Sequence, residues 1–399
     1  MIWQGGKVMD KSFKSGLDVI YLTSCALNGI TPDRGVIEAM DLEAVFGQAK
    51  RHRMLSITYM AIESCRDTLE PELARKWGIS APQAVKSSLM YSVEREKLYR
   101  FMDENEIAYL PLKGIIMQDI YPKLGMRQMA DNDILIDIDK RHLVRDYMVK
   151  NGYKSDGYGK DMHDVYIKPP IYNFEIHVYL AIESVDAVFY NYYLDLWQRL
   201  QRQDDKRSEY RFSVEDFYIY TLVHAYKHIN YTGGIGIKPL TDIFVYLRRY
   251  EDSLDRGYLD AELERIRLTA FEKNMRLLSK KIFDAEATKE NRIEDGLNEE
   301  EIQLLKFFID SGSFGNKDTL YRGMIDRFAN GEGKITRTGK IRYLLSRLFP
   351  TGPYIRENYP FFHRHKILLP ALWVYRFFTK IFVKFGHVCK ELKFISKQK

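Results

Sequence analysis

The chain has 399 residues, of which 45% are hydrophobic and 29% are charged, and its net charge at pH 7 is +6. One hydrophobic core rarely holds so many residues, so we expect more than one domain, and the composition excludes a disordered or fibrous chain. The charge is too small to indicate a large nucleic-acid footprint. The three cysteines, Cys25, Cys65 and Cys389, lie far apart, which excludes a cysteine metal motif and fits a reducing cytoplasm.

The end segments of the sequence predict neither a signal peptide nor a membrane-spanning helix. Residues 1–7 lack the apolar core of a signal peptide, and the apolar run 367–375 contains Pro370 and is too short to span a bilayer. We therefore expect a cytoplasmic protein. The tail 364–399 mixes basic residues with Trp and Phe, so it is either an amphipathic helix on a membrane surface or a core stripe with snorkelling Lys and Arg stems.

Apolar residues recur with helical spacing near both ends of the chain and with strand spacing in between. This order predicts an α+β fold, with a mixed-sheet α/β core between N-terminal and C-terminal helical regions. Residues 1–105 are predicted to be helical, 106–200 to form the α/β core, 201–363 a helical domain, and 364–399 a basic-aromatic helix or tail. Within the core we expect, in order, strand 107–112, helix 115–121, strand 132–138, helix 140–150 and strands 164–168 and 173–180. The clearest later helices are 212–230 and 240–250, and surface loops are expected at 201–211, 288–301 and 330–340.

Acidic and apolar residues alternate over most of residues 131–138, which is typical of a strand. Side chains two apart on a strand share a face, so Asp131 and Asp133 project together, about 7 Å apart at Cα. Two carboxylates at this range repel each other unless a cation lies between them, and such oxygen ligands suit Mg²⁺. The alternative is a strand with a solvated acidic face.

Two basic residues near this strand indicate a phosphate site. Lys113 and Gly114 form a predicted turn before the helix 115–121, and Arg127 lies just upstream of the acidic strand. A glycine lets the backbone approach a phosphate closely, and Lys113 and Arg127 would supply the charge that a triphosphate needs.

A third carboxylate, Glu175, lies on a later strand between Phe174 and Ile176, so it points away from the apolar layer. His177 shares its face. Glu175 either completes a metal site with the two aspartates or faces solvent on an edge strand.

The predicted helix 212–230 carries His224 and His228 on one face, with Lys227 between them. Zinc would need a third ligand that the nearby sequence does not offer, so packing or ligand contact beside the glycine-rich stretch 231–236 is the other interpretation. Lys238 and Asp242 follow this stretch. Asp242 either caps a helix, forms a salt bridge or lines a cleft between domains.

Together these motifs resemble the DNA polymerase beta-like nucleotidyltransferase superfamily, in which a glycine turn and a short helix precede Asp-x-Asp/Glu and a later carboxylate. They are similar above all to the bacterial group called nucleotidyltransferase family proteins, over roughly residues 15–376. The matching residues are Leu112 to Gly114, Tyr121 and Pro122, Gly125 to Asp133, His224 to His228, Gly234 to Lys238, and Asp242. One departure is Ile115, which replaces the serine that usually touches phosphate.

The resemblance implies transfer of a nucleoside monophosphate from an NTP such as ATP to a hydroxyl or amine of an unknown acceptor, expected to be a small molecule. It implies two Mg²⁺ ions, with Mn²⁺ as the other fitting cation. Asp131, Asp133 and Glu175 would hold the metal, with Glu175 also acting as base. Lys113, Gly114 and Arg127 would bind phosphate. The acceptor side would comprise His177, His224, Lys227, His228, Lys238 and Asp242.

Two other functions stay open at this level. One is a toxin-like transferase that modifies tRNA or a protein, against which the modest net charge weighs. The other is a degenerate fold that binds a nucleotide or a partner without turnover. Ile115 favours this second alternative, whereas the three clustered acids oppose it.

Overall fold

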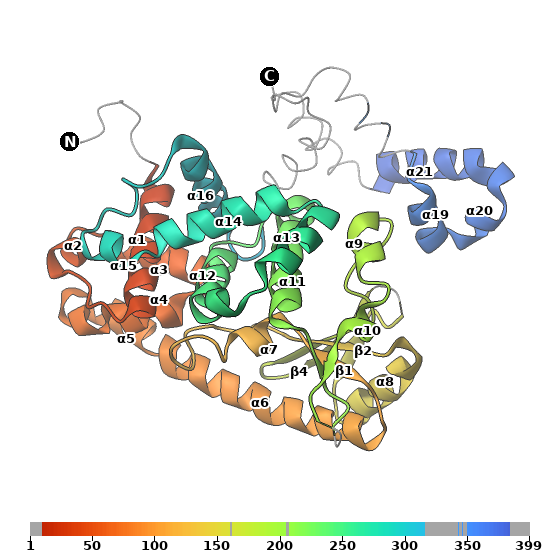
Figure 1. Ribbon diagram of the computed structural model, residues 1–399, viewed down its shortest axis with the longest axis horizontal. Helices are drawn as coiled ribbons and strands as arrows, with labels where there is room; N and C mark the ends of the chain where they lie inside the picture. Colours follow the sequence, from red (N-terminus) through yellow and green to blue (C-terminus); the bar gives the residue numbers. More distant parts are fainter. Residues whose placement is uncertain are drawn as a thin grey trace.

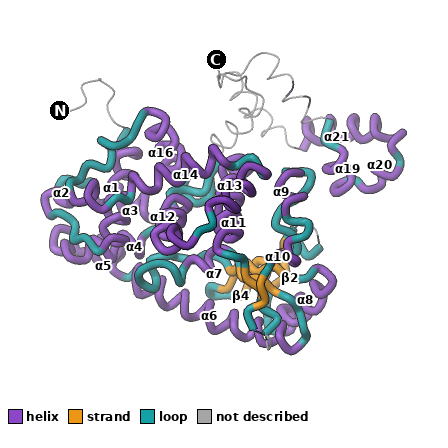
Figure 2. The backbone as a smooth tube through the Cα atoms, in the orientation of Figure 1, coloured by secondary structure: helices purple, strands orange, loops and turns teal. Residues whose placement is uncertain are grey.

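The computed structural model describes residues 10–159, 162–204, 207–315, 342, 345 and 349–383 (Figure 1). It confirms the predicted α+β class, because helices surround a mixed five-stranded sheet (Figure 2). The predicted loop 330–340 and the tail beyond residue 383 lie outside the described residues. Within the described part, no helix combines the length and apolar content that crossing a bilayer requires.

The N-terminal region consists of helices with clear end signals. Helix α1 (Lys11–Asn28) begins after Asp10, whose side chain accepts the Ser12 N–H, and ends at Gly29 in the left-handed conformation. The long helix α6 runs beneath the sheet in Figure 1. The remaining elements of this region are α2 (Arg34–Glu38), α3 (Leu42–Arg51), α4 (Leu55–Ile62), η1 (Glu63–Thr68), α5 (Pro71–Gly78) and α6 (Ser80–Glu104).

The sheet has the strand order β1-β2-β5-β4-β3, in which only the β2–β5 pair is parallel. Pro111 ends the edge strand β1, as its missing N–H requires. The bounds are β1 (Tyr109–Pro111), β2 (Asn132–Ile136), β3 (Lys154–Asp156), β4 (His163–Lys168) and β5 (Tyr172–His177). The sequence does not predict β3, because its three exposed residues include none that is apolar.

Side-chain alternation gives the sheet two different faces. Ile134 and Ile136 of β2, with Phe174 and Ile176 of β5, pack into a core against α6 and α8 (Arg141–Lys150). The intervening residues therefore face the other side, toward the helix α11. This alternation agrees with the prediction and leaves the acidic side chains outside the apolar core.

The link between β1 and β2 differs from the expected turn and helix. Helix α7 (Lys113–Met117) begins at Lys113 itself and is shorter than the predicted helix 115–121. Lys113 has φ of 29°, in the left-handed region that non-glycine residues rarely adopt. The backbone at Lys113 is therefore strained next to the acidic strand.

The C-terminal helices share one hydrophobic core with α1, α3 and α4. Two short strands form a hairpin inside the predicted loop 201–211, and α11 continues into a π-helical turn, η3, that ends at Gly233. The elements are α9 (Ala187–Tyr192), α10 (Leu196–Arg199), β6 (Gln201–Arg202), β7 (Tyr210–Arg211), α11 (Val214–Lys227), η3 (His228–Thr232), α12 (Lys238–Tyr250), η4 (Glu251–Ser253), α13 (Arg256–Arg265), α14 (Thr269–Ile282), α15 (Ala285–Lys289) and α16 (Glu299–Ser311).

A separate group of helices projects from this body at the right of Figure 1. It comprises α19 (Gly352–Asn358), α20 (Pro360–Arg364), η5 (Lys366–Leu368) and α21 (Leu369–Val383). We call residues 349–383 the C-terminal module.

Candidate active site

The predicted carboxylates come together at the start of β2 and on β5. Asp133 lies directly opposite Glu175 in the parallel β2–β5 pair. Asp131 immediately precedes β2 and lines the same cavity as the other two. Glu175 therefore points to the same side of the sheet as Asp133, as its flanking apolar residues predict.

The three carboxylates cannot all ionise freely. Burial and the neighbouring Asp133 and Asp131 raise the pKa of Glu175 to about 8, and burial with Asp133 also raises the pKa of Asp131. Burial opposes ionisation of Asp133 too, but Lys113 and a hydrogen bond from His177 outweigh it and lower its pKa. The three carboxyls can therefore all ionise only when a further cation joins them, which fits a site for a divalent cation.

Lys113 and His177 both contact Asp133. Lys113 Nζ lies 3.5 Å from Asp133 Oδ2, and His177 Nε2 lies 2.8 Å from Asp133 Oδ1. Both partners are themselves largely buried. Asp133 is therefore held in one orientation from two sides.

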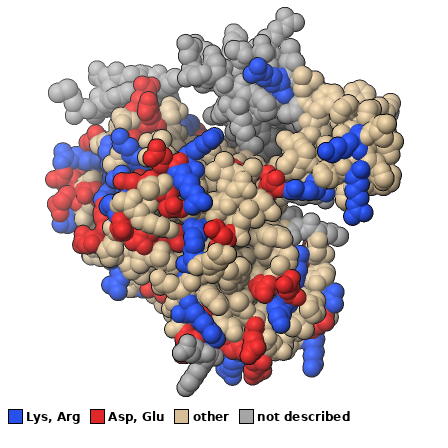
Figure 3. Space-filling model, turned by 45° about the vertical axis from the view of Figure 1, so that its right-hand side comes forward, with Lys and Arg blue, Asp and Glu red and all other residues tan. Residues whose placement is uncertain are grey.

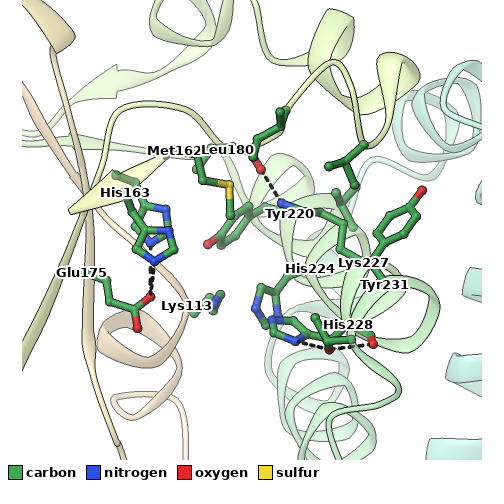
Figure 4. A pocket seen from close by; sticks show the side chains of 15 residues that line it. Lys113, Met162, His163, Glu175, Leu180, Tyr220, His224, Lys227, His228 and Tyr231 are labelled. Atoms are coloured by element: carbon green, nitrogen blue, oxygen red, sulfur yellow. Dashed lines mark hydrogen bonds and ion pairs between the residues drawn. The ribbon is translucent and has the colours of Figure 1, made fainter. Parts of the chain in front are cut away.

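Two adjoining cavities open beside these residues. The first, the carboxylate cavity, has a volume of about 250 Å³ and contains the three acids in its wall. The second, the histidine cavity, has a volume of about 320 Å³ (Figure 4). Lys113, Glu175, His224 and His228 line both, so the cavities meet where the sheet faces α11.

The histidine cavity has a largely uncharged lining. His224 and His228 lie with ring centroids 4.3 Å apart, and burial lowers the pKa of both, that of His228 to about 3, so both rings are neutral. Lys227 Nζ donates to the Leu180 carbonyl at 2.7 Å, and burial lowers its pKa to about 8. Most other lining residues are apolar or aromatic: Met162, Leu180, Ile182, Val185, Tyr220, Val223 and Tyr231.

Arg127 and Asp242 form a buried ion pair in this structure. Arg127 Nε and Nη2 donate to the two oxygens of Asp242 at 2.8 and 2.9 Å, and the Tyr121 hydroxyl donates to Oδ1 at 2.7 Å. Asp242 is not among the described residues that line either cavity, whereas Arg127 lines the carboxylate cavity. From the sequence, Asp242 is expected to cap a helix, to form a salt bridge or to line a cleft. The structure shows the salt bridge, which is buried inside the protein.

Gly114 and Lys238 also lie at the carboxylate cavity. A Cβ on Gly114 would come within 2.8 Å of Arg127 Nη1, so the glycine leaves room for the guanidinium. Lys238 Nζ donates to the Gln128 carbonyl at 3.0 Å, and burial lowers its pKa to about 8. The basic residues from three segments thus converge here, although each already has a protein partner.

Other residues of the cavity walls are not predicted by the sequence pattern. His163 begins β4 opposite His177, and Arg53 and Phe314 contribute to the carboxylate cavity from distant segments. Pairing strands 164–168 and 173–180 as a hairpin would have placed His163 beside His177. Nothing in the sequence pattern predicts that Arg53 or Phe314 lines the carboxylate cavity.

A family model described as an uncharacterised nucleotidyltransferase matches residues 38–284, which is more than half of the chain and includes most of both cavity walls. The chain belongs to this nucleotidyltransferase family. No curated protein and no solved structure matches it. Membership confirms the resemblance seen in the sequence and indicates a transferase that uses a nucleotide substrate.

Proposed function

We propose that this nucleotidyltransferase transfers a nucleoside monophosphate from an NTP in the carboxylate cavity to an acceptor in the histidine cavity, and that the reaction depends on a divalent cation. The observation that carries this proposal is the junction of the two cavities at Glu175 and Lys113. Two substrates in these cavities would meet beside a carboxylate and an ammonium group.

Each residue at the junction has a role that follows from its chemistry. Divalent cations bound by Asp131, Asp133 and Glu175 would neutralise phosphate charge and stabilise the attacking and leaving oxygens. Lys113 would shift from Asp133 to a phosphate oxygen, since an ammonium can contact both. His177 would keep Asp133 oriented.

In the reaction, an oxygen or nitrogen of the acceptor attacks the α-phosphorus of the NTP. The new bond to phosphorus forms as the bond to the β-phosphate oxygen breaks, and pyrophosphate leaves with that electron pair. The acceptor proton would pass to the Glu175 carboxylate, which lines both cavities and which a bound divalent cation would keep ionised despite its raised pKa.

The lining of the histidine cavity constrains the acceptor. Its apolar and aromatic side chains, with a volume of about 320 Å³, fit a small molecule with an apolar or aromatic part. The Lys227 ammonium and the neutral imidazoles of His224 and His228 would contact its polar groups. A long polyanion such as tRNA has no matching feature in this lining.

The test is NTP turnover with labelled NTPs, Mg²⁺ or Mn²⁺ and a panel of small acceptors bearing hydroxyl or amine groups. Asp133→Asn is expected to reduce pyrophosphate release by at least a hundredfold. Asp139→Asn, at an exposed position just beyond the same strand, is the matched control and should retain full activity. Retention of more than a few per cent of turnover in Asp133→Asn would contradict the proposal, and NTP binding without turnover would favour the degenerate alternative.

A further inference from the structure

Beside the oxygen-rich site, His163, Glu175 and His177 form a cluster of mixed donors. Strand pairing places His163 opposite His177, and both imidazoles lie next to Glu175. Among the described residues, this is the one set of three His, Cys, Asp or Glu side chains whose ligand atoms lie within 4.8 Å of one another. Asp131 is outside this set.

The distances in the cluster suit a shared ion better than direct hydrogen bonds. Glu175 Oε2 lies 3.8 Å from His163 Nε2 and 3.9 Å from His177 Nε2. Two ligands that bind one ion at about 2.1 Å lie roughly 3–3.6 Å apart, so a shift of a few tenths of an ångström would suffice. His177 Nε2 also forms a hydrogen bond of 2.8 Å with Asp133 Oδ1, and a bound ion would replace the proton in that contact, with Asp133 as a fourth donor.

We infer that His163, Glu175 and His177 bind a first-row transition-metal dication, in a position on the histidine-cavity side of the three-carboxylate site, with which it shares Glu175. Imidazole nitrogen favours Mn²⁺, Fe²⁺, Co²⁺ or Zn²⁺ over Mg²⁺, whose preferred ligands are oxygens. All three residues line the histidine cavity, whereas Asp131 lines only the carboxylate cavity. This metal position therefore lies on the side of the proposed acceptor. Any role of the metal in catalysis rests on the proposed function.

The experiment measures metal binding directly, with any affinity tag removed. Calorimetry with Mn²⁺ and with Mg²⁺, and visible absorption with Co²⁺, are recorded for the wild type, His163→Gln and the control His142→Gln on the exposed side of α8. His163→Gln is expected to weaken Mn²⁺ binding at least tenfold and to change the Co²⁺ spectrum, while Mg²⁺ affinity changes less than twofold. Unchanged Mn²⁺ affinity and an unchanged Co²⁺ spectrum would overturn the inference.

The two proposals can fail separately in this design. If the wild type shows the histidine-dependent Co²⁺ spectrum but transfers no nucleotide to any acceptor, the metal position stands and the proposed function fails. If nucleotide transfer occurs but His163→Gln binds every metal as the wild type does, only the metal position fails.

A second, independent observation concerns the C-terminal module, which has a charged group inside and apolar groups outside. Arg376 is buried, lies 5.2 and 5.6 Å from the ring centroids of Tyr354 and Tyr359, and donates to the Tyr359 hydroxyl. The outer surface instead carries large apolar side chains that are 51–90% exposed: Phe361, Ile367, Val374, Tyr375 and Phe378. Several large apolar side chains exposed on so short a segment indicate an interaction site.

The charge of this part of the chain identifies the partner. Residues 349–383 contain five Lys or Arg and one Glu, a net charge of +4, whereas the other 364 residues together have a net charge of only +2. Figure 3 shows blue basic side chains on the module among the tan surface. Arg364 and Lys366 are exposed and lie between the exposed Phe361 and Ile367 in the sequence, so cationic and apolar groups are both accessible in this segment.

We propose that this module docks on the surface of a bilayer with anionic headgroups. The aromatic and aliphatic side chains would enter the interfacial layer, and the basic side chains would contact lipid phosphates and carboxylates. Arg356 of the module pairs with Glu183, whose neighbours Ile182 and Val185 line the histidine cavity. The module is thus attached next to the acceptor side.

Co-sedimentation with vesicles tests this docking. The full chain should bind vesicles that contain phosphatidylserine at least tenfold more tightly than pure phosphatidylcholine vesicles. Ile367→Ser combined with Phe378→Ser should lose at least tenfold of that affinity, whereas Val93→Ser, 62% exposed on α6, should not. Absence of binding to anionic vesicles would overturn the proposal. So would a wild-type protein that self-associates through this surface, shown by loss of self-association in the double variant but not in Val93→Ser.

Discussion

Replacing Arg127 by methionine is expected to lower the free energy of unfolding by about 3–5 kcal/mol, because it leaves a buried carboxylate without its cation. The Arg127 and Asp242 side chains are each only 9% exposed and are joined by two hydrogen bonds of 2.8 and 2.9 Å. After the substitution, Tyr121 would be the remaining donor seen on Asp242 in the described structure. One neutral hydroxyl, worth about 1 kcal/mol, cannot replace a bidentate guanidinium.

The double variant Arg127→Met with Asp242→Leu provides the matched control. The double variant leaves no buried carboxylate without a cation. It should therefore be more stable than Arg127→Met alone by about 2 kcal/mol or more. Urea unfolding followed by circular dichroism measures all three proteins. A loss below about 1 kcal/mol for Arg127→Met, or strictly additive effects in the double variant, would refute the structural role assigned to this pair.

Three further predictions concern the phosphate contact, a glycine and a buried histidine. Lys113→Ala should weaken binding of an NTP, with divalent cation present, by about 1.5–3 kcal/mol more than binding of the monophosphate, and equal losses in calorimetry would exclude contact with the β- and γ-phosphates. Gly236→Ala should cost about 2 kcal/mol or more in denaturant unfolding, because φ is +74° and a Cβ would lie 2.6 Å from His52 Nδ1; a wild-type midpoint would contradict this. Burial and Arg51 lower the pKa of His52 to about 4, so the folded state resists its protonation. Stability should therefore be complete above about pH 6.5 and fall by about 3 kcal/mol as the pH drops to about 4, and His52→Gln should flatten that part of the unfolding profile.

The sequence alone determined the central α/β unit and the face on which its acids lie. Alternation along a strand is a local property, so it assigns Asp133 and Glu175 to the side opposite Ile134 and Ile176 without any knowledge of how the strands pair. The family resemblance rests on short-range motifs of the same kind and is confirmed. Helix ends and the short exposed strand β3 are less predictable, because few apolar residues mark them.

Only the tertiary structure decided what each basic residue contacts. Arg127 and Asp242 are 115 positions apart, and nothing in their local sequence shows that they pair. The same holds for His163 and His177, which become neighbours through the β4–β5 register, and for the two cavities, whose walls combine the sheet with α11. Local periodicity fixes which way a side chain points from its own element, but the partner that it meets depends on how distant elements pack.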